Sequence, residues 1–351
     1  MDASSEFSFR IKNKNDIYVT LSDIGGVIMS VLTGIFMGPF KIEALFEIIS
    51  SLDQVNKLLN EGWSTLKWDK YHSLFFICTV YTVSTFILIL DLYSWSERTE
   101  TNQLSITYVK NYLSFYIFYF VLISQQLAYN NLSLHVKRRV MSLNMILAEE
   151  IMRKTEKNDG DFIFWIKMES REPTERFLQK NEAMKLYSKG TNGKILVFPA
   201  ALEQVEHCVR AINNFFDYPL MIILITCFIH IIITIWGILV SYYTRWLFLI
   251  MNIVWIVIQT ARLLFVVEPI HSCLFEMSKT KPLVAKLITQ ADKGDTRSRL
   301  DVIVQKVKIS NMKFTAAGIV SVTRPMICTI AGAVTTYLVI LYQLHSMKRV
   351  N

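Results

Sequence analysis

Long apolar stretches alternate with polar connections along the whole chain. The apolar stretches are about 20 residues long and carry almost no charge, which is the length that a helix needs to cross a bilayer. We predict spans at 19–40, 71–93, 108–130, 216–241, 246–267 and 325–344. The first contains Ser22, Asp23 and several glycines, so it is also compatible with an interfacial or a closely packed helix. The predicted fold class is all-α, a polytopic transmembrane helical bundle.

The connections between the spans carry apolar residues at helical spacing. The stripes are Ile42, Leu45, Ile49, Leu52, Val55 and Leu59; Val136, Val140, Leu143, Leu147 and Ile151; Leu202, Val205, Val209, Ile212 and Phe216; and Leu300, Ile303, Val304 and Val307. Each stripe predicts a helix with one apolar face. We expect these helices to pack into a bundle outside the membrane; the alternative is that they lie flat on the bilayer surface. The stretch 153–195 is rich in charge and lacks periodicity, so we expect disorder there.

Lysine and arginine indicate the orientation of the spans. They concentrate in 41–70, 132–214 and 268–313, whereas 94–107 and 242–245 carry few. Basic loops stay in the cytosol, so the C-terminus is predicted to be extracellular and, by parity, the N-terminus as well. Basic residues at 10–14 and 348–349 oppose this assignment.

The resulting organisation has seven parts. They are an extracellular segment 1–18, spans within 19–131 with the cytosolic connection 41–70, a cytosolic loop 132–214 that is amphipathic and partly disordered, spans within 215–267, a cytosolic anchor segment 268–324, a last helix 325–344 and an extracellular tail 345–351.

Composition narrows the function. Of the 351 residues 52% are hydrophobic and only 19% are charged, as expected for a membrane protein. The net charge of +8 comes from the loops, so it does not indicate nucleic acid. None of the five cysteines forms a CxxC pair, which favours free thiols over a disulfide or zinc framework.

Patterns that would indicate catalysis are missing from the sequence. His207 and Cys208 are adjacent and point to different sides of a helix, which disfavours a metal site. His230 and Asp91 lie in spans, where a lone histidine is more often a packing residue and a carboxylate near a span end is more often solvated. We therefore expect no enzyme, no cofactor and no metal.

The last apolar segment has a distinctive arrangement. It reads "FTAAGIVSVTRPMICTIAGAVTTYLVILYQL", with Thr336 and Tyr337, five apolar residues, then Gln343 and Leu344. It resembles the C-terminal signature of insect gustatory receptors, in which the last residue of the motif is usually Phe. The segments "FTAAG", "SVTRPMI" and "GAVTTY" are similar to the family as well.

The resemblance implies seven spans with a cytosolic N-terminus. On that alignment 19–40 corresponds to the family's second span, and 1–18 to the remnant of an extracellular loop. We therefore expect one further span upstream of this sequence.

The resemblance also implies a function. Family members are tetrameric, ligand-gated, nonselective cation channels in the plasma membrane of chemosensory neurons, assembled as homo- or hetero-tetramers. Each subunit contributes its last helix to a central pore and holds a small-molecule tastant in the outer half of its bundle. Sugars, bitter compounds, carbon dioxide and internal nutrients all occur as ligands.

These implications single out particular residues. Helical spacing around Gln343 places Ile340, Val339 and Thr336 on the expected pore face, with Tyr337 packed between subunits. The residues expected deepest in the outer halves of the spans, and hence in a tastant pocket, are Tyr116, His230, Asn252 and Trp255.

Three rival readings remain. An accessory subunit that does not conduct alone stays open because of the missing span. A G-protein-coupled receptor would need its C-terminus in the cytosol. A transporter would commonly show an internal repeat, and none is visible.

Overall fold

The computed structural model describes residues 14–59, 63–98, 104–155, 194–240, 246–289, 295–310 and 312–350. Most of the stretch predicted to be disordered, 153–195, lies outside these residues. The elements are α1 (Lys14–Phe40), α2 (Ile42–Leu59), α3 (Trp63–Arg98), α4 (Leu104–Thr155), α7 (Lys194–Val240), α8 (Trp246–Thr289), α9 (Asp295–Ile309), β1 (Thr315–Ala316), β2 (Val320–Ser321) and α10 (Arg324–Val350). The all-α prediction is confirmed.

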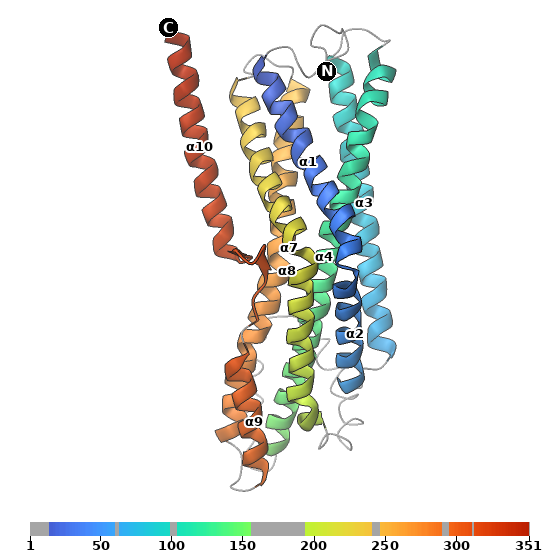
Figure 1. Ribbon diagram of the computed structural model, residues 1–351, viewed down its shortest axis with the longest axis vertical. Helices are drawn as coiled ribbons and strands as arrows, with labels where there is room; N and C mark the ends of the chain where they lie inside the picture. The colour runs from blue at the N-terminus through green and yellow to red at the C-terminus, as the bar shows by residue number, and fades with distance from the viewer. Residues whose placement is uncertain are drawn as a thin grey trace.

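Three helices are much longer than a membrane is thick. α4, α7 and α8 contain 52, 47 and 44 residues. At 1.5 Å per residue they are about 65–80 Å long, against about 30 Å of hydrocarbon. Each can therefore cross the membrane and continue well beyond it. The amphipathic stretches predicted next to the spans of α4 and α7 are continuations of the same helices (Figure 1).

Among the described residues, four helical stretches are apolar and long enough to be spans, namely Tyr71–Ser94, Val197–Leu239, Leu249–Thr289 and Arg324–Gln343. Ile24–Phe40 and Ile42–Leu59 qualify together, as a pair bent by 72°. Within the described part of the chain, α4 is not among them. It nevertheless runs beside α8 through the bundle (Figure 1).

The end of the bundle that carries α2 and α9 has a packed apolar core. All five residues of the stripe predicted on α4 are buried there, as are all five of the stripe predicted on α7: Val136, Val140, Leu143, Leu147, Ile151, Leu202, Val205, Val209, Ile212 and Phe216. Ile303 and Val307 of α9 join the same core. A packed helical bundle, rather than helices lying flat, is what the structure contains.

The predicted face of α2 is confirmed at Val55 and Leu59 and is wrong in the first part of the helix. Ile42 and Ile49, expected in the stripe, have 48% and 54% of their side chains exposed. The buried side chains of α2 are Ala44, Ile48, Ser51, Val55 and Leu59. Small residues occupy two of these positions because α2 packs closely on α7, and hydrophobicity alone does not mark them.

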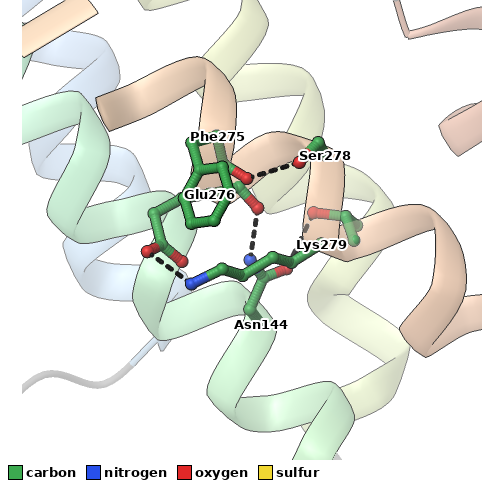
Figure 2. Close-up of polar contacts among 6 residues, drawn as sticks. Asn144, Phe275, Glu276, Ser278 and Lys279 are labelled. Carbon is green, nitrogen blue, oxygen red and sulfur yellow. Dashed lines mark hydrogen bonds and ion pairs between the residues drawn. The ribbon is translucent and has the colours of Figure 1, made fainter. Parts of the chain in front are cut away.

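α4 and α8 are joined by polar contacts as well as by apolar packing. The Asn144 amide donates to the Glu276 carbonyl at 2.8 Å and accepts from the Thr280 hydroxyl at 2.7 Å. Figure 2 shows Asn144 reaching from α4 into this turn of α8, beside the ion pair of Glu276 and Lys279. Since Thr280 is only 1% exposed, the Asn144 oxygen supplies the acceptor that its buried hydroxyl needs.

A short hairpin leads from α9 into α10. β1 and β2 pair in antiparallel register, with Thr315 opposite Ser321. Ala317 and Gly318, at φ of 51° and 64°, are the two central residues of a tight left-handed turn, which the Ile319 N–H closes by donating to the Ala316 carbonyl at 3.1 Å. The backbone N–H of Ala317 donates to the Asp217 carbonyl at 3.2 Å, which fixes the turn on α7.

α10 begins at Arg324, as the proline at position 325 predicts. Its first turns, with Met326, Ile327 and Ile330, pack against the core. Of its described side chains only Val334 is buried, and the helix then stands apart from the bundle (Figure 1). It ends at the end of the molecule where α1 begins, opposite α9.

Candidate ligand site and candidate pore helix

Asp91 on α3 is the acidic centre of a buried group of polar side chains. Only 3% of its side chain is exposed. The Tyr116 hydroxyl donates to one carboxylate oxygen at 2.7 Å, and the Trp255 indole N–H donates to the other at 2.8 Å. The sequence favoured a solvated carboxylate here, which is wrong because α4 and α8 pack against this part of α3. Charge-assisted hydrogen bonds stabilise a carboxylate in such surroundings.

His230 on α7 joins α4 and α8. Its Nδ1 lies 2.9 Å from Gln259 Nε2 and 3.3 Å from the Tyr119 hydroxyl. The amide nitrogen can only donate, so Nδ1 accepts, and the neutral imidazole carries its proton on Nε2. Because Arg262 donates to the oxygen of Gln259, it fixes the orientation of that amide and hence the tautomer of the histidine.

Arg262 is a buried cation in the middle of α8, with 8% of its side chain exposed. It donates to Gln259 Oε1 at 2.7 Å and to Gln126 Oε1 at 3.1 Å. Its guanidinium also lies 5.8 Å from the centre of the Tyr119 ring. Amide oxygens and an aromatic face therefore stabilise this charge within the described part of the chain, where no carboxylate forms an ion pair with it.

We call these side chains the polar cluster: Asp91, Tyr116, Tyr119, Gln126, His230, Trp255, Gln259 and Arg262. They come from α3, α4, α7 and α8, and α1 closes the group on one side. There Ser30 bonds to Thr226 at 3.1 Å, and an ideal Cβ on Gly26 would lie 3.2 Å from Thr226. A glycine at this position allows α1 to approach α7 closely.

The structure brings three of the four expected pocket residues into the polar cluster. Tyr116 and Trp255 share Asp91, and His230 is reached through Tyr119, whose ring lies 5.3 Å from that of Trp255. Asn252 lies one turn before Trp255 on α8 and is partly buried.

Several cluster members were not selected from the sequence. Arg262, Gln259 and Gln126 are polar side chains inside or beside predicted spans, and such residues mark functional positions in membrane proteins. Their polar residue type and their depth in the predicted spans are therefore the sequence features that could have identified them as site residues.

α10 carries the expected pore residues on an uncovered surface. Thr336, Val339, Ile340 and Gln343 are all exposed in the single chain. Tyr337 is 52% exposed, and its ring meets Phe228 of α7 edge to face at 5.9 Å between centroids. The side chain of Leu344 lies outside the described part of the chain.

The described residues contain no group of three or more His, Cys, Asp or Glu side chains that could hold a metal ion. The five cysteines are free, with Cys208, Cys227 and Cys273 buried and Cys78 and Cys328 exposed.

Comparison with known proteins agrees with this arrangement. A family model described as 7tm chemosensory receptor matches residues 18–348. The gustatory receptor for sugar taste 43a of Drosophila melanogaster is 24% identical over 370 residues, covering 97% of this chain and 84% of the relative. The putative gustatory receptor 28a of the same species is 28% identical over 145 residues, which cover 38% of this chain and 32% of the relative.

A solved structure shares the fold. The insect olfactory receptor OR5 from Machilis hrabei superimposes with a TM-score of 0.53 at 11% sequence identity, covering 95% of this chain and 90% of the other. Identity this low shows the fold alone. With the family match extending over nearly the whole chain, the protein is a multi-pass membrane protein that belongs to the 7tm chemosensory receptor family and is a homologue of insect gustatory receptors.

Proposed function

We propose that this chain is a gustatory receptor subunit, a ligand-gated nonselective cation channel opened by a small-molecule tastant at the polar cluster. The observation that carries the proposal is the convergence of a carboxylate, an imidazole, amides and a guanidinium from four helices inside an apolar bundle. Polar and ionisable groups in a membrane are costly, and they persist where they contact a ligand, an ion or one another. In a family of chemosensory receptors, the tastant is the natural ligand for such a group.

The relative with the longest match is named as a receptor for sugar taste, and the cluster has the chemistry to bind a sugar. Asp91 can accept from hydroxyl groups, Gln259 and His230 can exchange hydrogen bonds with them, and Trp255 offers an aromatic face. A few placed polar groups with aromatic walls are typical of small-molecule sites. We therefore expect a polyhydroxylated ligand.

The exposed surface of α10 supports its assignment as the pore helix. Tyr337, Val339, Ile340 and Tyr342 are 45–60% exposed in the single chain, so in a bilayer they meet lipid or other subunits. In a tetramer, Thr336 and Gln343 would face water, and Val339 and Ile340 would form an apolar constriction between them. The α9 end would lie in the cytosol and the C-terminus outside the plasma membrane of a chemosensory neuron.

The test is calcium imaging and whole-cell recording of cells that express the chain, alone and with a partner gustatory receptor, against a panel of sugars and bitter compounds. We expect a sugar to evoke a cation current. Asp91→Asn should raise the half-maximal concentration about tenfold or more, because hydrogen bonds to a charged group are lost. Ile89→Ala, a change at an exposed position of the same helix, is the control and should leave the curve in place.

Three outcomes would contradict parts of the proposal. A current only with a partner would make the chain an accessory subunit. No response in either setting would contradict the proposed function. A response that is equal for Asp91→Asn and Ile89→Ala would remove the polar cluster as the ligand site.

A further inference from the structure

An ion pair joins the first residue of α10 to α8. Arg324 forms a two-pronged contact with Glu268, with Nε to Oε1 at 2.9 Å and an Nη to Oε2 at 2.8 Å. The two side chains are 55% and 42% exposed. Within the described part of the chain, no other hydrogen bond or ion pair links α10 to the helical bundle. The remaining contacts of α10 with the bundle are apolar.

The pair lies at a weak point of α8. Glu268 precedes Pro269, and a proline inside a helix removes the hydrogen bond to the carbonyl four residues earlier. That carbonyl, on Phe265, accepts instead from the Asn130 amide of α4 at 3.3 Å. Helices bend at such positions, so the part of α8 before Pro269 can tilt relative to the part after it.

The part of α8 before this point carries three members of the polar cluster. Trp255, Gln259 and Arg262 lie on it, and Gln259 is nine residues, or about 13 Å along the axis, from Glu268. A shift of these residues therefore moves the same helical segment that ends at Glu268.

The geometry at α10 favours a role for the carboxylate. Arg324 is at the helix N-terminus, where a positive charge is unfavourable because the backbone N–H groups point outward. The negative charge of the Glu268 carboxylate offsets the guanidinium charge of Arg324 and the partial positive charge of the helix N-terminus. Breaking the pair leaves an arginine at the wrong end of the helix dipole, which shifts the preferred position of the first turn of α10.

We propose that the Glu268–Arg324 pair couples the polar cluster to the start of the pore helix, so that tilting of α8 at Pro269 displaces the first turn of α10. The functional meaning of this coupling rests on the proposed channel function. The coupling itself is a property of the chain that can be measured without a current.

Cys328 provides the measurement. It is a native, exposed thiol one turn after Arg324, and Cys78 is the other exposed cysteine. The full-length chain with Cys78→Ser is expressed in cells, and membrane patches are excised so that the α9 end faces the bath. The rate at which a water-soluble methanethiosulfonate modifies Cys328 then reports the position of this turn. Gln259→Leu is the perturbation at the polar cluster.

With the ion pair intact, we expect Gln259→Leu to change the rate about twofold to tenfold. In the Arg324→Gln background the same change should have no effect beyond that of Arg324→Gln itself. The exchange of charges, Glu268→Arg with Arg324→Glu, should keep the sensitivity to Gln259→Leu. Asp53→Asn, which breaks an exposed ion pair within α2, serves as the control and should leave every rate unchanged.

Equal effects of Gln259→Leu with and without Arg324 would overturn the coupling, as would no effect in either background. An ion pair that only stabilises the fold would lower surface expression without making the two changes interdependent. Absence of any tastant current would contradict the channel function while leaving the thiol result to stand or fall separately.

Discussion

At the scale of single residues, Arg262 shows how the interior of this bundle accommodates a charge. Its two amide acceptors are themselves buried, Gln259 one turn earlier on α8 and Gln126 on the neighbouring helix α4. Arg262→Met would leave both amide oxygens without their donor. We expect a loss of about 1–3 kcal/mol in the free energy of unfolding, measured as a lower Tm in detergent.

Arg210 on α7 provides the matched control, because it is an exposed arginine on another long helix. Arg210→Met should leave the Tm unchanged. Equal Tm values for the two variants would mean that the hydrogen bonds of Arg262 contribute nothing to stability.

Gly34 is a second residue whose role is geometric. An ideal Cβ built there would lie 1.6 Å from the Gln125 amide nitrogen of α4, whereas one at Gly38 of the same helix meets nothing within 4 Å. Gly34→Ala therefore forces the end of the Gln125 side chain into another position, which should cost about 0.5–1.5 kcal/mol. Gly38→Ala requires no such movement, so we expect it to be the more stable of the two variants in a thermal unfolding assay. Adding Gln125→Ala should remove the difference; equal stability of Gly34→Ala and Gly38→Ala would contradict the close approach of α1 and α4.

At the scale of the elements, α2 places two adjacent isoleucines on different faces, although their hydrophobicity does not distinguish them. Ile48 is fully buried, and its neighbour Ile49 is 54% exposed. Ile48→Ala should cost about 2–4 kcal/mol, and Ile49→Ala less than about 0.5 kcal/mol. Chemical denaturation measures the free energy of unfolding of the two variants, which carry the same substitution at adjacent positions of one helix. If Ile49→Ala were the more harmful change, the face inferred from the sequence would be right after all.

Helix positions were largely predictable and contacts between helices were not. The apolar periodicity of α4 and α7 placed Val140 and Leu202 in the core correctly, because apolar residues at helical spacing mark the face that is buried. It failed in the first part of α2, where Ala44 and Ser51 are buried because their small side chains permit close packing. Periodicity records hydrophobicity, and small residues at a tight interface carry little of it.

The polar cluster illustrates the same limit. Tyr116, His230 and Trp255 could be chosen by residue type and depth in their spans. Asp91 was interpreted as solvated, because the sequence of one helix does not show that two others cover it. The hydrogen bonds that connect Asp91, Tyr116 and Trp255 join residues 25 and 164 positions apart, and only the fold brings them together.

At the scale of the whole molecule, the orientation in the membrane is a prediction with a simple test. The sequence Asn131-Leu132-Ser133 on α4 is an N-x-[ST] acceptor for N-glycosylation. The Asn131 side chain accepts a hydrogen bond from Ser73 of α3 at 3.0 Å. With the α9 end in the cytosol, this asparagine is never exposed to glycosylation. Glycosidase treatment should therefore cause no shift in electrophoretic mobility. A shift that disappears in Asn131→Gln would invert the orientation.

The proposed pore is a property of the whole assembly, because it would need α10 of several chains. In each chain α10 packs against the bundle near its start and again at Tyr337, which meets Phe228 of α7, while most of its described side chains beyond Val334 are exposed. This arrangement is expected of a helix that completes its packing against other copies. Such a helix presents its polar stripe to water only if the stripe faces the axis of the assembly.

Substituted-cysteine accessibility during recording tests this claim most directly. In a chain with Cys78→Ser and Cys328→Ser, cysteine is placed at Ile340 or Gln343, and at Leu338 or Leu341 as controls. We predict that a positively charged methanethiosulfonate blocks the sugar-evoked current at Ile340 and Gln343, and reacts faster in the presence of sugar. Inert cysteines at both positions, with block from Leu338 or Leu341, would contradict the account and place a different face of α10 at the pore.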